Sequence, residues 1–428
     1  EEEAEVETEQ PDAADDVQVV DAAAAATATA ATATAAAATS PDEDNHEKAS
    51  KSGVTPEFRS DRDVERKGDD AEIQHDHKDE HTKMDSEPVT EPVTKTVTAH
   101  GDIPVDDEWN HLISSEPGSI FPPESKRYHL YVAYACPWAH RTVIVRNLKG
   151  LQDAIGITYV HPTWQFTNPD VDDHRGWVFG SSEEKAPSFS NTAGMGTFPA
   201  NWGEEDPHMN AKSIRELYKM SNDTTGKYIL PVLWDTKLNT IVSNESSEII
   251  RMLNFEFNEF AKNPELNLYP ETLEKQIDEL NGWVYPTLNN GVYKCGLAST
   301  QEAYDEAIDE LTDAFDKVDS ILQKQRYLAG NTFTEADVRL FVTLIRYDEV
   351  YNVYFKTNTR NVATTPAVLN YVRDLYQMKA ITDSCRMDMI KAHYFTSHVE
   401  LNKFSIIPRG DNFLGLLSQP HGRESLDP

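Results

Sequence analysis

The sequence of 428 residues predicts a mixed α/β domain followed by an all-helical domain, with a long acidic segment ahead of both. Three observations support this fold class. A strand, helix and strand pattern spans residues 128–160, helical periodicity dominates after about residue 270, and the first hundred residues nearly lack large apolar side chains. We expect residues 1–100 to be a disordered acidic low-complexity tail and residues 101–127 to be an ordered arm on the first domain.

The acidic segment restricts the classes of partner. Residues 1–100 carry about half of the net charge of −34, and Phe58 is their only aromatic residue. Such a segment buries too little apolar surface to offset the entropy cost of ordering, and its charge disfavours binding to nucleic acid. No stretch of the sequence has the length of an apolar membrane span. We therefore expect neither a nucleic acid nor a membrane as partner.

The location of the protein in the cell is predicted from the Ala/Thr run, the cysteines and the first residue of the chain. The Ala/Thr run at 22–38 lacks the positive region of a signal peptide and is interpreted as linker. Three widely spaced cysteines predict neither a disulfide framework nor a metal site, which favours a reducing compartment. We expect a cytoplasmic protein; because the chain does not begin with Met, an organellar location after removal of an upstream targeting segment is the alternative. The tail histidines are interpreted as solvated and not as metal ligands: His75, His77 and His81.

The first domain begins with a βαβ unit. Strands are predicted at 128–134 and 157–160, with a helix between them from Pro137 to Leu148 that ends at Gly150. One face of this helix holds Trp138, Thr142, Val145 and Leu148. The two strands are expected to be parallel.

Three further segments complete this domain. A helix is predicted near 211–220, strands at 227–235 and 240–243, and a last helix from about Ser246 to Asn254. Pro231 inside an apparent strand is tolerated if a cis bond lies at the strand entry. The resulting order, β-α-β-α-β-β-α, is that of a thioredoxin-like domain, which we place at residues 128–255.

The second domain is predicted to be all-helical. After a linker at 256–270, the apolar period of three to four residues recurs in segments near 271–285, 300–325, 335–350, 365–378 and 384–395. We place this domain at 271–400 and a C-terminal extension at 401–428. Thr334 to Asp337 fits a helix capping box, so Asp337 is assigned a structural role.

Cys136 is the main candidate for chemistry. It lies where the first strand turns into a helix, and a helix N-terminus favours the thiolate form. Its motif, Cys136-Pro137-Trp138-Ala139, has no second cysteine, so a mixed disulfide formed there needs an outside thiol. The alternative is an inert core cysteine, which is the interpretation given to Cys295 and Cys385.

Several motifs resemble the Xi class of glutathione transferases, the glutathionyl-hydroquinone reductases. They are Cys136 to Ala139 with Arg141-Thr142, Pro231 to Asp235, Ser243 to Ser246, Asn289 to Lys294, and His393 to Phe395. The resemblance covers about residues 105–425. It implies a thioredoxin-like N-terminal domain, an all-α C-terminal glutathione transferase domain, a homodimer, glutathione as co-substrate, and no permanently bound cofactor or metal.

The resemblance also implies a reaction and its residues. Cys136 attacks the sulfur of an aromatic glutathione conjugate, Tyr293 donates a proton to the departing ring, and Tyr351 and Tyr394 lower the pKa of the thiol. The implied glutathione contacts are Trp177, Lys227, Tyr228, Ile229, Leu230, Glu245 and Ser246. The residue-based alternatives are a simple helix cap at Glu245-Ser246 and ordinary core packing for each tyrosine.

Two other functions remain open at this stage. An omega-like thioltransferase or dehydroascorbate reductase would share the cysteine and the glutathione site. The three tyrosines favour the glutathionyl-hydroquinone reductase over this alternative. A non-catalytic ligand-binding module would keep only the fold. The long segment between Trp177 and Lys227 leaves the shape of the acceptor pocket undetermined.

Overall fold

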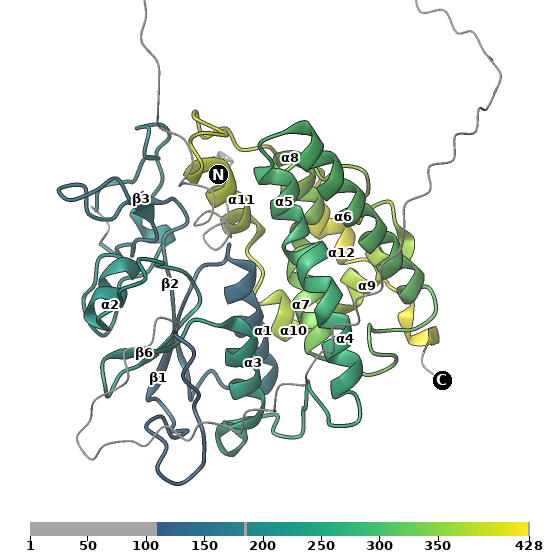
Figure 1. Ribbon diagram of the computed structural model, residues 1–428, viewed down its shortest axis with the longest axis horizontal. Helices are drawn as coiled ribbons and strands as arrows, with labels where there is room; N and C mark the ends of the chain where they lie inside the picture. The colour runs from purple at the N-terminus through teal and green to yellow at the C-terminus, as the bar shows by residue number, and fades with distance from the viewer. Residues whose placement is uncertain (1–108, 184–185, 427–428) are drawn as a thin grey trace, which may run out of the picture. The chain divides into compact units, whose positions relative to one another are not determined.

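A four-stranded sheet organises the first domain in the computed structural model, which describes residues 109–183 and 186–426 (Figure 1). The strand order is β2-β1-β5-β6. Strand β1 pairs in parallel with β2 and antiparallel with β5. The strands are β1 (Tyr128–Val132), β2 (Gly156–Tyr159), β5 (Val232–Asp235) and β6 (Thr240–Ser243). The predicted thioredoxin-like topology is therefore confirmed.

Residues outside the described ranges include several that carry predictions. The acidic tail, its three histidines, the first part of the arm and the last two residues of the extension lie there. The described part of the arm contacts β6: the His111 N–H donates to the Val242 carbonyl at 3.0 Å. The Trp109 indole N–H donates to Asp223 at 2.9 Å. This part of the arm thus extends the edge of the sheet.

Helix α1 (Pro137–Lys149) is buried on almost every side, so the prediction of a single apolar face is too narrow. It packs against α3 (Ser246–Phe255) of its own domain and against two helices of the second domain, α7 (Glu335–Arg346) and α10 (Lys379–Thr382). Trp138 and Leu148, from the predicted face, are only partly buried. The second domain covers the sides that the sequence pattern assigned to solvent.

The segment before β5 corrects the sequence prediction. Residues 227–230 form no strand, and a cis peptide bond joins Leu230 to Pro231. Pro231 has no N–H to donate to a neighbouring strand, so the ladder begins only at Val232. The structure also adds a small antiparallel hairpin, β3 (Gln165–Phe166) and β4 (Arg175–Gly176), and it shortens the predicted helix to α2 (Ile214–Met220).

The second domain is helical, as predicted, and the structure adds short helices at 291–297, 352–354, 379–382 and 413–417 that lie outside the predicted segments. Two predicted helices end earlier and continue as π-helical turns, Tyr285–Asn289 and Tyr347–Tyr351. The remaining helices are α4 (Glu274–Val284), α5 (Gly291–Leu297), α6 (Gln301–Leu322), α8 (Asn352–Tyr354), α9 (Pro366–Tyr376), α11 (Met387–Ser397) and α12 (Phe413–Leu417). Within the described ranges, no helix has both the length and the apolar character needed to cross a bilayer.

Asp337 anchors the start of α7, as its motif predicted. Its carboxylate accepts hydrogen bonds from the backbone N–H groups of Leu328 and Thr334 and from the Tyr371 hydroxyl, each at 2.9 Å. Asp337→Ala leaves these buried donors without an acceptor and should lower the free energy of unfolding by about 3 kcal/mol.

Urea unfolding of the full chain measures this effect. The matched control is Asp305→Ala on the exposed face of α6, which should change stability by less than about 0.5 kcal/mol. Equal stability of the two variants would contradict the anchoring role.

Candidate active site

Cys136 occupies the N-cap position of α1 and is 5% exposed. Its sulfur accepts a hydrogen bond from the Ala139 N–H at 3.4 Å, and the Leu230 carbonyl oxygen lies 3.4 Å from the same sulfur. Backbone N–H groups and the positive end of the helix therefore face the sulfur, which favours the thiolate. The loop before β5 therefore lies directly beside the thiol.

Arg346, at the end of α7, holds the backbone that leads into Cys136. Its guanidinium is fully buried and donates to the carbonyl oxygens of Tyr134 at 2.8 Å and Ala135 at 3.1 Å. It also contacts the His140 ring, with 3.1 Å between the two nitrogen atoms. A side chain of the second domain thus fixes the position of the thiol-bearing turn in the first.

Arg141 is a second buried guanidinium, on α1 itself. It donates to the Ser246 hydroxyl at 3.3 Å and to the Asn289 side-chain oxygen at 3.0 Å, while its Nε finds no hydrogen-bond partner among the described residues. Burial and the nearby charge of Arg339 lower the pKa of Arg141 to about 9, so it remains charged at neutral pH. Cys136 is one of the groups whose negative charge opposes this lowering. By reciprocity, the Arg141 charge favours the Cys136 thiolate.

The three predicted tyrosines meet in one buried cluster. The Tyr293 hydroxyl lies 2.5 Å from that of Tyr394 and 3.4 Å from that of Tyr351, and the latter two are 3.2 Å apart. Burial raises the pKa of Tyr293 well above its ordinary value, and burial also raises the pKa of Tyr351. These two phenols remain protonated at neutral pH and are available as proton donors.

This tyrosine cluster adjoins the thiol. The Tyr293 ring packs against Trp138, two residues after Cys136, with 5.4 Å between the ring centroids. A negative charge on Cys136 contributes to the raised pKa of Tyr351. The structure therefore brings the predicted nucleophile and the three predicted phenols into one region, with the phenols supplied by the second domain.

The residues matched to glutathione contacts differ in their exposure to solvent. Two of them lie next to residues described above, Leu230 beside Cys136 and Ser246 beside Arg141. Ser246 is buried at the start of α3 and Glu245 is exposed beside it, without a side-chain capping bond. Trp177 is buried and stacks on His393 at 4.8 Å, and its indole Nε1 has no hydrogen-bond partner among the described residues. Lys227 is exposed, while Tyr228 and Ile229 are half-buried.

The other two cysteines differ from Cys136. Burial raises the pKa of Cys295 to about 11 and that of Cys385 to about 12, so both thiols stay protonated at neutral pH. This agrees with their interpretation as packing residues. In the described part of the chain, no three His, Cys, Asp or Glu side chains are grouped so as to hold a metal ion.

Two protein-family models match the parts of the chain that contain Cys136 and α7. Residues 135–255 match the N-terminal domain of glutathione S-transferase and residues 301–374 match its C-terminal domain. The two domains are thus those of a glutathione S-transferase.

Individual relatives narrow the class. Glutathionyl-hydroquinone reductase YqjG of Escherichia coli is 41% identical over 305 residues, which cover 71% of this chain and 84% of YqjG. A Xi-class transferase structure from Natrialba magadii is 39% identical with a TM-score of 0.66, covering 74% of this chain and 89% of that one. The glutathione-bound structure of YqjG is 39% identical with a TM-score of 0.64, and the match covers 75% of this chain and 97% of the YqjG chain. The chain belongs to the Xi class of the glutathione S-transferase family.

The Arg141 charge is testable through its effect on the thiol. Because loss of the positive charge makes the thiolate harder to form, Arg141→Met should lower the rate of Cys136 alkylation by iodoacetamide about tenfold at pH 6.5. The deficit should shrink as the pH rises and the thiol ionises in both proteins.

Two variants serve as controls for this measurement. Arg141→Lys keeps the charge and should recover most of the rate. Arg146→Met removes a buried guanidinium one turn further along α1, which donates to the Ile155 carbonyl, and should leave the pH profile unchanged. A profile for Arg141→Met that superimposes on that of the wild type would contradict the electrostatic role.

Proposed function

We propose that this enzyme uses glutathione to reduce glutathionyl-hydroquinones to free hydroquinones. The observation that carries the proposal is a single thiol at the N-terminus of α1 beside a buried cluster of three phenols. A thiol alone suits many disulfide exchanges. Protonated phenols next to it suit the cleavage of a carbon–sulfur bond, where the carbon fragment needs a proton.

In the first step, the Cys136 thiolate attacks the sulfur of the conjugate. A sulfur–sulfur bond forms between Cys136 and glutathione, and the bond between that sulfur and the aromatic carbon breaks. The electron pair of the broken bond stays on the ring, which takes a proton from Tyr293. The raised pKa of Tyr293 keeps the proton on the phenol until the ring carbon, a much stronger base, requires it.

In the second step, the thiolate of another glutathione attacks the mixed disulfide. This releases glutathione disulfide and restores the Cys136 thiolate. The ring carbon gains two electrons and a proton, while the thioether sulfur of the conjugate and the thiol sulfur of the second glutathione are joined as a disulfide; the proton lost by that thiol restores Tyr293, so the step balances. The absence of a second cysteine at Ala139 makes the outside thiol necessary at this step.

Glutathione is proposed to bind along the loop before β5 and the start of α3. The Leu230 backbone would pair with the cysteinyl backbone of glutathione, as it lies beside the Cys136 sulfur. Glu245 and the Ser246 N–H would take the ammonium and carboxylate of the γ-glutamyl end. Trp177, whose buried N–H has no partner among the described residues, and the run Lys227, Tyr228 and Ile229 would complete the contacts.

The proposal includes a homodimer acting in the cytoplasm, as the Xi-class resemblance implies. A reducing compartment keeps the Cys136 thiol reduced and supplies the glutathione that the second step consumes. Light scattering of the purified protein measures the mass: twice that of the chain is expected, and the mass of a single chain would contradict the dimer.

Cys136 is the first residue to test. Purified enzyme with a glutathionyl-hydroquinone and glutathione should release hydroquinone, and Cys136→Ser should reduce the rate by at least about a thousandfold. Cys295→Ser, a change at a packing thiol, should retain activity. If Cys136→Ser is as active as the wild type, the mechanism is wrong.

Tyr293 separates the proposed function from the thioltransferase alternative. Tyr293→Phe should lower the rate of hydroquinone release by about a hundredfold, because the ring loses its proton donor, and leave the reduction of a simple mixed disulfide within about threefold. Tyr347→Phe, a change at a buried phenol outside the tyrosine cluster, is the matched control.

The two reactions are followed on the same preparations by chromatography of the products. An equal loss in both reactions would mean that Tyr293 only supports the structure. A wild type that reduces mixed disulfides but releases no hydroquinone would establish the thioltransferase instead.

A further inference from the structure

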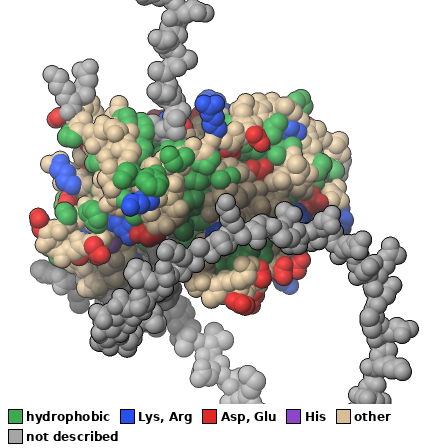
Figure 2. Space-filling model, turned by 90° about the horizontal axis from the view of Figure 1, so that it is seen from above, with side chains coloured by type: hydrophobic (Ala, Val, Ile, Leu, Met, Phe, Trp, Pro, Cys, Tyr) green, Lys and Arg blue, Asp and Glu red, His purple; other side chains and the backbone are tan. Residues whose placement is uncertain are grey.

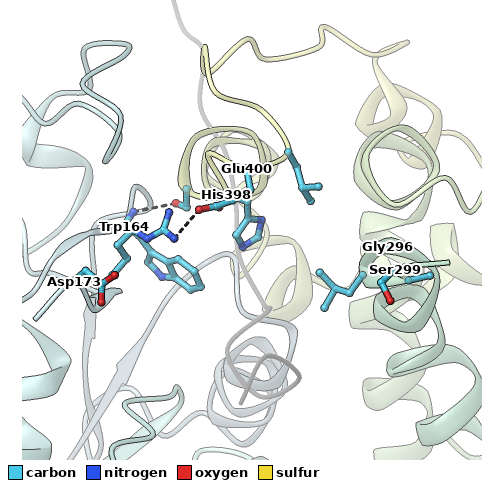
Figure 3. A pocket seen from close by; sticks show the side chains of 11 residues that line it. Trp164, Asp173, Gly296, Ser299, His398 and Glu400 are labelled. Atoms are coloured by element: carbon cyan, nitrogen blue, oxygen red, sulfur yellow. Dashed lines mark hydrogen bonds and ion pairs between the residues drawn. The ribbon is translucent and has the colours of Figure 1, made fainter. Parts of the chain in front are cut away.

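A pocket of about 560 Å³ lies where the hairpin β3–β4, the end of α5 and the end of α11 approach one another (Figure 3). Trp164 and Asp173 form one side in this view, Gly296 and Ser299 the opposite side, and His398 and Glu400 lie between them. Its volume is in the ordinary range for small-molecule sites. The pocket shares no lining residue with the glutathione contacts or the tyrosine cluster.

The pocket is nonetheless one helical turn away from that cluster. Leu297, on its wall, follows Tyr293 by four residues and is the last residue of α5, and His398, the residue just after the end of α11, follows Tyr394 by four residues. Residues four apart lie on the same side of a helix, about 6 Å along its axis. The rings of Tyr394 and His398 are 6.1 Å apart. The wall of the pocket is therefore about one helical turn from the hydroxyl-bearing rings of Tyr293 and Tyr394.

The lining is suited to an uncharged apolar group. The exposed apolar side chains of Leu297 and Leu401 flank it, at 38% and 51% exposure. The guanidinium of its wall, that of Arg175, is paired with Glu400 at 2.6 Å, and the Asp173 carboxylate on the same wall opposes an anionic occupant. The face at the top of Figure 1, seen directly in Figure 2, carries grouped hydrophobic side chains.

Trp164 gives the pocket a fixed aromatic wall. Its backbone N–H donates to the Ser397 hydroxyl at 2.9 Å, and its ring packs edge-on against His393 and His398 at 4.6 and 5.3 Å. Its indole Nε1 is buried and has no hydrogen-bond partner among the described residues. Because this N–H is buried, the wall offers its occupant a flat apolar surface.

We infer that this pocket is a specificity subsite that binds the outer substituent of the acceptor, an aryl or apolar alkyl group carried on the hydroquinone ring. This inference rests on the proposed function. It makes substituted hydroquinones, rather than the bare ring, the preferred class of substrate. Binding energy of the outer group would hold the reacting sulfur near Cys136.

The test compares two conjugates that differ only in the outer group, glutathionyl-hydroquinone and its phenyl-substituted form. Leu297→Trp fills the pocket from its rim. It should lower kcat/KM for the phenyl-substituted conjugate about tenfold and change that for the unsubstituted conjugate by less than about twofold. Leu238→Trp, at a leucine of similar exposure in the turn between β5 and β6, should change neither value.

Binding to the Cys136→Ser protein, measured by calorimetry, keeps this inference separate from the catalytic proposal. The phenyl-substituted conjugate should bind about tenfold more tightly than the unsubstituted one, and adding Leu297→Trp should remove the difference. Equal binding of the two conjugates to Cys136→Ser, or equal losses for both in Leu297→Trp, would overturn the subsite. A wild type that binds both conjugates with this preference but releases no hydroquinone would contradict the proposed function and leave the subsite standing.

Discussion

The site depends on the hydrogen bonds that Arg346 donates to the turn before Cys136. A fully buried guanidinium from α7 donates to two consecutive backbone carbonyls, those of Tyr134 and Ala135, and contacts His140 one turn into α1. A buried charge is costly unless its donors are satisfied, so these contacts form together or not at all. The nucleophile on one domain and the phenols on the other are thereby held at one relative position.

The two domains supply different parts of the site, the first the environment of the thiolate and the second that of the phenols. The thioredoxin-like domain supplies the helix N-terminus and the exposed backbone beside Leu230, which suit a thiolate and a peptide-like ligand. The helical domain supplies a dry environment in which burial keeps Tyr293 protonated. A dry environment without the Arg141 charge would favour the neutral thiol, because burial penalises charge. This guanidinium and the N-terminus of α1 allow a thiolate and buried phenols to lie close together.

Much of this could be predicted from the sequence, for identifiable reasons. Cys136, Pro137 and Gly150 mark helix ends through local backbone chemistry, so α1 was predicted to within one residue. The sequence pattern predicts strand at 227–230 because Tyr228, Ile229 and Leu230 are aromatic or apolar, whereas Pro231 prevents the ladder from continuing into this segment. The roles of Arg141 and Arg346 were not predicted, since a charged residue in a helix ordinarily faces solvent and only the packing of a second domain buries it. The pocket beside Trp164 is lined by segments more than two hundred residues apart in the sequence, such as those of Trp164 and His398. A local sequence pattern cannot predict such a contact.

The central claim is that Cys136 takes the glutathionyl group from the conjugate before any second thiol acts. Mass spectrometry of a single turnover tests it directly: reduced enzyme is mixed with excess glutathionyl-hydroquinone in the absence of free glutathione and digested under acid. The account predicts one glutathionyl group on the peptide containing Cys136 and one equivalent of hydroquinone per active site. Release of hydroquinone without that adduct, or the adduct on Cys295 or Cys385 instead, would contradict it.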